Sequence, residues 1–337
     1  MDIEQINPLN RPALAAWHAT VVAAETFGRA DTATPYQLPE VEAELAAQQD
    51  VTRLVFAGIE GGRTMVAAGR IDMPLTHSRT HAAVAVFVHP DHRRRGHGSR
   101  MLEQLVTVAR GHGRTLLNAE ANWPYDGAVD GSGTAPVEFL RRHGFTFGIG
   151  DVMRTMDLPV DEAVLERLAA EAAPYHAAYT LRSFVGRVPE ELEEGWAALV
   201  SRLDVEAPVG QMEREAESAD IAELRRKQDV IEAQGRTKFN TVALDASGAV
   251  VAYTDLAISR HDPENAFQWG TLVDPAHRGH RLGLAVKVAN LRLFQSRPQS
   301  ATRLRTWNAE SNTHMVAVNE ALGFRPAERL GEFQKRL

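Results

Sequence analysis

Three short motifs occur twice in this chain, and they occur in the same order. Residues 88–98 (VHPDHRRRGHG) are repeated at 273–283 (VDPAHRGHRLG), with Pro, His, Arg and the final Gly at matching offsets. Residues 118–122 (NAEAN) are repeated at 308–312 (NAESN), and each half then reaches a Gly-Phe pair, at Gly144 and Gly323. Ordered internal similarity of this kind indicates a duplicated domain. A chain of 337 residues is long enough for two domains, each with its own core.

The two halves also share one order of predicted elements. In the first half we expect strands at 53–59, 64–71, 82–88 and 115–119, and a helix at 99–110. In the second half we expect strands at 240–244, 250–258, 267–273 and 303–307, and a helix at 282–294. The segment 82–88 is almost wholly apolar, which is typical of a strand covered on both faces. We expect domains at 1–158 and 178–337, joined by a linker helix at 159–177, although a helix of either domain is an equal alternative.

Composition excludes several classes of protein. The chain has no cysteine, so disulfides, thiolate metal sites and a cysteine nucleophile are excluded. A net charge of −7 argues against nucleic acid as a partner, because phosphate backbones require a basic surface. Neither a leader-like segment nor an apolar run of membrane-spanning length is present in the sequence, so we expect a cytoplasmic protein with no membrane partner. We expect a monomer or a homodimer.

The repeated motif has the features of an anion-binding site. It lies between an apolar strand and an amphipathic helix, and the start of a helix presents unpaired N–H groups and the positive end of the helix dipole. Glycines at 96 and 98 allow the backbone to approach a diphosphate closely, and the neighbouring arginines add positive charge. A dinucleotide-binding fingerprint requires a third glycine where Met101 stands, and the lysine of a Walker A loop is absent from the motif.

These residues resemble the acetyl-CoA signature of the GNAT superfamily of N-acetyltransferases, and 308–324 is similar to that family's second motif. The resemblance covers both halves and implies an α/β fold of two tandem GNAT-like domains, each a mixed, splayed central sheet flanked by helices. It implies acetyl-CoA as cosubstrate, with a free amide at Val88 or Val273 to polarise the thioester carbonyl. The acetyl-CoA residues it implies are Phe87, Val88, Arg93, Arg94, Arg95, Gly96, His97, Gly98 and Ser99 in the first half. In the second half they are Leu272, Val273, Arg278, Gly279, His280, Arg281, Leu282 and Gly283.

The two halves depart from the family pattern in different ways. We call 93–99 the N-terminal cradle and 278–283 the C-terminal cradle. Arg281 stands where the N-terminal cradle has Gly96, and its side chain either crowds the diphosphate or replaces a backbone contact. We therefore expect the N-terminal cradle to bind acetyl-CoA more tightly. The tyrosine that often serves as general acid in the family is replaced by Leu140 and Asn319.

Candidates for the remaining chemistry are few. Glu120 and Glu310 follow equivalent strands and are candidates for the base that deprotonates a small amine acceptor, and Asn319 is a candidate to orient a water. A loop at 123–133 is present only in the first half, and its aromatic and acidic residues suggest contact with a cationic acceptor. The histidines near the first motif have no usual metal-site spacing, so we expect no metal. The alternative to an N-acetyltransferase is an acyl-CoA-binding scaffold with one or both halves silent.

Overall fold

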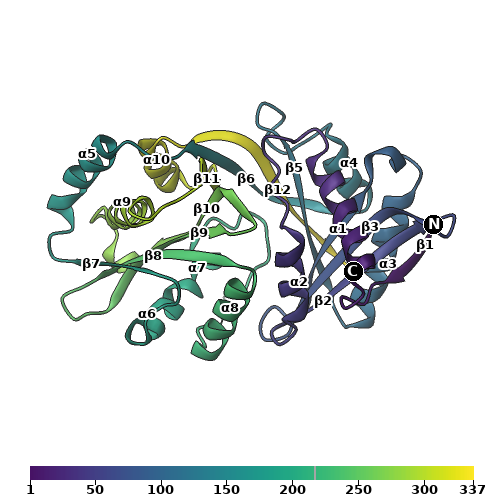
Figure 1. Cartoon of the computed structure of the whole chain (residues 1–337), viewed down its shortest axis with the longest axis horizontal. Helices are drawn as coiled ribbons and strands as arrows, with labels where there is room; N and C mark the ends of the chain where they lie inside the picture. The colour runs from purple at the N-terminus through teal and green to yellow at the C-terminus, as the bar shows by residue number, and fades with distance from the viewer. Residues whose placement is uncertain (216–217) are drawn as a thin grey trace. The chain divides into compact units, whose positions relative to one another are not determined.

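The computed structural model describes residues 1–215 and 218–337, and these form two compact units (Figure 1). The N-terminal unit comprises Met1–Gly150, Gly210–Met212 and Glu328–Leu337. The C-terminal unit comprises the described residues of Asp151–Val209 and Glu213–Ala327. Each unit has its own buried apolar clusters and its own run of six neighbouring strands, so each is considered separately.

The N-terminal unit is a mixed sheet in the order β1-β2-β3-β4-β5-β12. Its elements are β1 (Asp2–Gln5), α1 (Arg11–Thr26), α2 (Leu38–Ala46), β2 (Val51–Glu60), β3 (Thr64–Pro74), β4 (His81–Val88), η1 (Pro90–His92), α3 (His97–Gly111), β5 (Leu116–Pro124), α4 (Ala135–Arg142), the start of β6 (Thr146–Asp157) and the end of β12 (Arg325–Arg336). β4 and β5 are parallel, whereas the pairs β1–β2, β2–β3, β3–β4 and β5–β12 are antiparallel.

Helices cover both faces of this sheet, because alternate residues of its strands are apolar on both sides. α1 and α2 pack on one face, where Trp17 and Leu45 meet Ala68 of β3. α3 and α4 pack on the other face, where Leu105 and Val137 belong to the larger cluster. Odd-numbered residues of β5 lie in that second cluster, so Asn118, Glu120 and Asn122 point towards the face of α1 and α2.

The C-terminal unit repeats this plan, with the order β6-β11-β10-β9-β8-β7. Its elements, besides β6, are α5 (Glu162–Ala172), η2 (Ala173–Tyr175), β7 (Thr180–Val185), α6 (Glu190–Val200), α7 (Leu203–Glu206), α8 (Ile221–Ala233), β8 (Arg236–Leu244), β9 (Val250–Ser259), β10 (Asp262–Val273), η3 (Pro275–His277), α9 (Leu282–Gln295), β11 (Arg303–Ala309) and α10 (Thr313–Leu322). α5, α9 and α10 pack on one face, and α6 packs on the other. The predicted fold, a mixed α/β sheet flanked by helices in each half, is confirmed.

Each unit takes one strand from the other predicted domain range, because β12 lies within 178–337 and β6 lies within 1–158. β12 pairs with β5 from Glu328↔Pro124 to Arg336↔Leu116, and it thereby completes the sheet of the N-terminal unit. β6 pairs with β11 from Asp157↔Arg303 to Asp151↔Ala309 and completes the sheet of the C-terminal unit. Figure 1 shows the yellow C-terminal strand beside β5. Phe333 of β12 is fully buried in the core of the N-terminal unit, so that core requires the end of the chain.

The observed units therefore differ from the contiguous ranges 1–158 and 178–337, which stay a prediction about where each sequence repeat begins and ends. The predicted strands and helices of both halves are present at the expected places. The helix expected at 159–177 is α5, and it is not a free linker: Leu165 and Leu168 are buried in the core of the C-terminal unit. Asp161 caps this helix, accepting from the Ala163 N–H at 2.9 Å.

Candidate active site

The two parallel strands at the centre of each unit separate towards their carboxyl ends. β4 pairs with β5 only from His81↔Leu116 to Ala83↔Asn118, although β4 continues to Val88. β10 pairs with β11 only from Asn265↔Arg303 to Phe267↔Arg305. Strands that continue without pairing leave a wedge-shaped gap between them, which we call the splay.

Backbone amides at the end of β4 face this splay. The His89 N–H donates to the Val66 carbonyl of β3 at 3.0 Å. Because successive residues of a strand point their N–H groups to opposite edges, the Val88 amide is directed away from β3 and towards the splay. The same argument applies in the C-terminal unit, where the Asp274 N–H donates to Val251 and the Val273 amide faces β11. Both predicted oxyanion donors are therefore placed at a splay.

Each cradle turns through two left-handed residues before its helix begins. In the N-terminal cradle these are Arg94, with φ of 62°, and Gly96, with φ of 83°, and α3 begins at the next residue. A Cβ on Gly96 would meet no described atom within 4 Å, so the glycine serves the backbone angle and leaves the approach to the helix open. A Cβ on Gly98 would lie 3.2 Å from the ring of Phe139, so that glycine is required by packing. Ser99 follows, hydrogen-bonded to His143 at 2.9 Å.

The C-terminal cradle has the same backbone with a different sequence. Its left-handed residues are Gly279, with φ of 88°, and Arg281, with φ of 49°. A side chain in this region costs roughly 1–2 kcal/mol, so Arg281 is strained where Gly96 is not. Leu282 is buried in the core, and a Cβ on Gly283 would make ordinary contact with Val273.

The arginines of the two cradles have different partners. Arg93 donates to the backbone carbonyls of Val88 at 3.2 Å and Ala24 at 3.0 Å, and it lies over the ring of Phe27. Arg95 donates to the carbonyl of Asp91 at 3.2 Å. Carbonyl partners leave the formal charge of both arginines uncompensated.

In the C-terminal cradle, carboxylates neutralise the corresponding charge. Arg278 pairs with Glu206 at 3.0 Å. Arg281 pairs with Glu171 of α5 and lies over the ring of Tyr175, so its side chain is directed towards α5 and η2. His280 contacts the Tyr175 carbonyl at 3.2 Å. Both cradle arginines are therefore neutralised by carboxylates, whereas tighter binding of acetyl-CoA by the N-terminal cradle stays a prediction.

A cavity of about 1220 Å³ passes through the splay of the N-terminal unit. On the face of α3 and α4 it is lined by Val86, Val88, Leu102, Phe139 and Leu140, and it reaches Arg93, Arg94 and the glycines of the cradle. On the face of α1 and α2 it is lined by Phe87 and by the charged residues Glu25, Arg29, Glu44, Arg70, Asp72, Glu120 and Glu332. The cavity thus joins an anion-binding end to a carboxylate-rich end.

In the C-terminal unit, the side chains at the corresponding positions form hydrogen bonds with one another. Lys287 replaces Leu102 of the cavity lining and Asn319 replaces Leu140, whereas Asn308 is the unchanged counterpart of Asn118. The Lys287 ammonium donates to the Asn319 carbonyl oxygen at 2.8 Å, and the Asn319 amide donates to Asn308 at 2.5 Å. Asn319 is fully buried and both ends of its amide are engaged, which does not fit its predicted role in orienting a water.

The two predicted glutamates have unequal surroundings. Glu120 is exposed on β5, directly opposite Glu332 of β12, and both line the cavity. Glu310 lies in the exposed turn after β11. Directly opposite like charges disfavour one another unless a cation lies between them.

Glu25 of α1 is a functional candidate that sequence analysis missed. It lines the cavity, and burial raises its pKa above the ordinary value, against the opposing effect of Arg29 and Arg70. It also lies in the last turn of α1, where the negative end of the helix dipole disfavours a carboxylate. The only signal in the sequence was a lone acidic residue near the end of an apolar helix.

The arginines beside Glu25 are held by carboxylates of their own. Arg70 makes two hydrogen bonds to Asp72, at 2.8 and 2.7 Å, and an ion pair with Glu44 at 2.9 Å. Arg29 makes two hydrogen bonds of 2.7 Å to Glu328, whose side chain is only 4% exposed. Because Glu328 belongs to β12, the last strand of the chain supports the carboxylate-rich end of the cavity.

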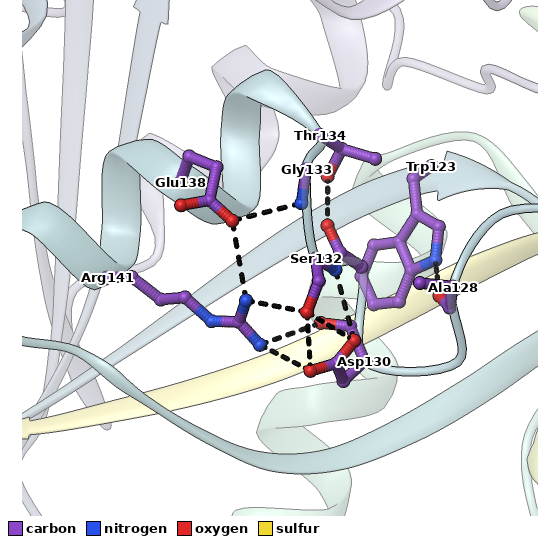
Figure 2. Close-up of polar contacts among 9 residues, drawn as sticks. Trp123, Ala128, Asp130, Ser132, Gly133, Thr134, Glu138 and Arg141 are labelled. Carbon is purple, nitrogen blue, oxygen red and sulfur yellow. Dashed lines mark hydrogen bonds and ion pairs between the residues drawn. The ribbon is translucent and has the colours of Figure 1, made fainter.

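The loop expected to contact the acceptor is built as a rigid surface structure. Figure 2 shows Arg141 of α4 paired with Asp130 at 2.6 Å, while the Ser132 hydroxyl also donates to Asp130. These contacts lower the pKa of Asp130 to about 2, with the Ser132 hydrogen bonds the larger cause. Trp123 is buried in the core, and its ring N–H donates to the Ala128 carbonyl at 2.8 Å. These residues therefore hold the loop together, and contact between the loop 123–133 and a cationic acceptor stays a prediction.

Histidines of the first motif converge on one carboxylate. His92 and His97 both approach Glu60 at the end of β2, at 3.8 and 3.7 Å. Burial is the main reason that the pKa of His97 lies below the ordinary value. The sequence spacing did not predict this grouping, because Glu60 is distant in the chain.

Comparisons with known proteins agree with this geometry. Residues 21–145 match the family described as Acetyltransferase (GNAT) family. The chain is similar in structure to a tandem GNAT protein from the clavulanic acid biosynthesis pathway, with 26% identity, a TM-score of 0.79, and 99% of this chain and 98% of that chain covered. Residues 21–145 therefore form a GNAT domain, and the whole chain has the fold of a tandem GNAT protein.

A GCN5-related N-acetyltransferase from Sphaerobacter thermophilus has the same fold, with 15% identity, a TM-score of 0.64, and coverage of 99% and 95%. Among curated proteins, no sequence matches this chain significantly. The family match and the structural similarity support an acyltransferase. Within the described residues, helices are too short or too polar to cross a membrane.

Lys287 gives the C-terminal unit a pH-dependent stability that can be measured. Burial lowers its pKa to about 7, whereas the ordinary value in an unfolded chain is about 10.4. Between these values the unfolded chain binds more protons, so this group makes stability rise as the pH rises. We expect the free energy of unfolding in urea of wild type, relative to that of Lys287→Met, to increase from about pH 7 upwards. A difference that does not change with pH contradicts this account of Lys287.

Proposed function

We propose that this tandem GNAT protein transfers an acetyl group from acetyl-CoA to a small cationic amine, and that the transfer takes place in the N-terminal unit. The observation that carries the proposal is the cavity of about 1220 Å³, because it joins a cationic cradle to a carboxylate-rich face through the splay. This volume suits ligands entering from two ends. The acyl-CoA supplies an activated thioester carbonyl, and the chain supplies binding, orientation and proton transfer.

The cradle end has the chemistry required by a diphosphate. The amides at the start of α3 are directed outwards past Gly96, and Arg93 and Arg94 line the same part of the cavity. The apolar side chains of Val86, Leu102 and Leu140 line the continuation into the splay, as suits a pantetheine arm. The Val88 amide at the strand end is placed to stabilise negative charge on a carbonyl oxygen during attack.

The opposite end has the charge required by an ammonium. Five carboxylates line it, namely Glu25, Glu44, Asp72, Glu120 and Glu332, against the two guanidinium groups of Arg29 and Arg70. Both arginines are already paired with carboxylates. The excess of carboxylates over guanidinium groups among these lining residues favours approach of a cationic amine.

The amine must lose a proton before its nitrogen attacks the thioester carbon. Glu25 has the better properties for this step, because its raised pKa gives a carboxylate that holds a proton more firmly. Glu120 remains the other candidate, directly or through water. After attack, the C–S bond breaks and the thiol leaves as thiolate, which tolerates the absence of a tyrosine at Leu140 because a thiol has a pKa of about 8.5.

The C-terminal unit is proposed to be catalytically silent. Lys287, Asn319 and Asn308 occupy the positions that line the cavity in the N-terminal unit, and Arg281 is bonded to Glu171. Glu310 and Asn319 then have no part in the chemistry. This unit supplies β11 as the paired neighbour of β6.

Replacement of Glu25 by Gln tests the proposed base. A raised pKa means that the ionised base is complete only above the usual glutamate range, so wild-type kcat/KM is expected to rise with pH there. Glu25→Gln should lower kcat/KM by roughly 100-fold and remove this acid limb. Glu310→Gln is the matched control and should change neither kcat/KM nor its rise with pH. If Glu120→Gln removes the limb while Glu25→Gln keeps it, Glu120 is the base.

Exchange of one residue between the cradles tests which unit works. Gly96→Arg places an arginine where the C-terminal cradle has one, and Arg281→Gly makes the reverse change. We expect Gly96→Arg to weaken acetyl-CoA binding in calorimetry by at least roughly 10-fold, or about 1.4 kcal/mol, and Arg281→Gly to leave it unchanged. Release of free thiol across a panel of amines, followed in parallel, separates an enzyme from an acyl-CoA-binding scaffold. Equal losses of acetyl-CoA affinity in Gly96→Arg and Arg281→Gly would overturn the assignment of the site to the N-terminal unit.

A further inference from the structure

Three potential metal ligands meet beside the N-terminal cradle. Glu60 ends β2, His92 ends η1, and His97 begins α3. One ligand atom from each lies within 4.8 Å of the other two. The Glu60 oxygens lie 3.7 Å from His97 Nε2 and 3.8 Å from His92 Nδ1, which is too far for a hydrogen bond.

The two imidazole nitrogens that face Glu60 are buried. His97 is only 5% exposed, and within the described part of the chain neither His97 Nε2 nor His92 Nδ1 has a hydrogen-bond partner. A buried polar atom without a partner costs about 1–3 kcal/mol. Two such atoms aimed at one carboxylate indicate a ligand between the three groups.

The duplicated fold shows that packing does not require a histidine at position 97. The C-terminal unit has Leu282 at the position of His97, and Leu282 is 1% exposed in an apolar cluster. The other repeat of the motif keeps a histidine, His277, but Tyr179 contacts its Nδ1 at 3.0 Å. Leucine therefore satisfies the fold at the start of this helix, and the histidine of the N-terminal unit has another purpose.

We propose that Glu60, His92 and His97 bind a divalent transition-metal ion, with Zn²⁺ the best match. Two imidazoles and one carboxylate, completed by water, are a usual zinc ligand set. Zn–N and Zn–O bonds of about 2.0–2.2 Å place tetrahedral ligand atoms about 3.4 Å apart. The two Glu60–imidazole distances, 3.7 and 3.8 Å, therefore need a closure of a few tenths of an ångström, and the two imidazole nitrogens lie within 4.8 Å of one another. The Glu60 side chain is 44% exposed and is free to make that movement.

Such an ion would join three segments that the chain connects only through turns. β2, η1 and the first turn of α3 would be fixed together, and the first turn of α3 carries the amides of the cradle. The ion would therefore hold the anion-binding end of the cavity in place. This site is independent of the acyl-transfer chemistry, because its ligands bind the metal whether or not the protein has an amine acceptor.

Zinc titration of the full-length, chelator-treated protein tests the site. We expect calorimetry to give one tight equivalent per chain and Co²⁺ to give the visible absorption of a low-symmetry site. His97→Leu, which copies Leu282, should weaken binding by at least the roughly 10–100-fold that loss of an outer-shell partner costs. Added zinc should raise the Tm of wild type and leave that of His97→Leu unchanged.

Two further variants make the test decisive, because the chain has 13 histidines. Glu60→Gln should weaken binding while keeping the shape of the side chain. His112→Gln alters an exposed histidine just after the same helix and should bind zinc as wild type does. The proposal is overturned if wild type takes up no stoichiometric zinc, or if His112→Gln loses as much affinity as His97→Leu. An unchanged metal-free Tm in His97→Leu establishes that this variant folds.

Discussion

The loss of pairing between β4 and β5 after Ala83 and Asn118 is the constraint on which the rest of the N-terminal unit depends. Strands that stop bonding leave backbone amides directed into the gap, and the Val88 amide is one of them. The gap also connects the two faces of the sheet, so ligands held by helices on opposite faces can meet within it. A closed sheet with the same side chains would separate the cationic cradle from the carboxylates of α1 and β5.

The C-terminal unit shows what happens when the same backbone receives different side chains. Its strands also separate after Phe267, and its cradle has the same left-handed turns. Lys287 and Asn319 nevertheless bond across the positions that line the cavity in the other unit, and Glu171 and Glu206 neutralise the cradle arginines. A buried ammonium costs stability, so this arrangement indicates a structural role rather than a second acyl-CoA site. Because the motif is duplicated, each of its residues in the N-terminal unit can be compared with a counterpart in the C-terminal unit.

Sequence reasoning reached what local patterns determine and missed what distant pairing determines. The cradles, their flanking strands and helices, and the difference between Gly96 and Arg281 follow from spacing and glycine content within short segments. The exchange of β6 and β12 does not, because a strand's pattern does not identify its neighbour. Glu25 and Glu60 were missed for the same reason: each acquires its surroundings from segments far along the chain. Trp123 and Asp130 were assigned to a ligand because their partners Ala128 and Arg141 are visible only once the loop is folded.

The central claim is that a single acyl-CoA site exists, in the N-terminal unit, although the chain has two cradles. Hydrogen–deuterium exchange with and without acetyl-CoA tests it directly, because the two cradles fall in different peptides. Binding should slow exchange of the amides at the end of β4 and the start of α3, around residues 86–102, where they would bond to the ligand. Peptides covering 271–287 should exchange at the same rate with and without acetyl-CoA. Protection of 271–287 equal to or greater than that of 86–102 would contradict the account.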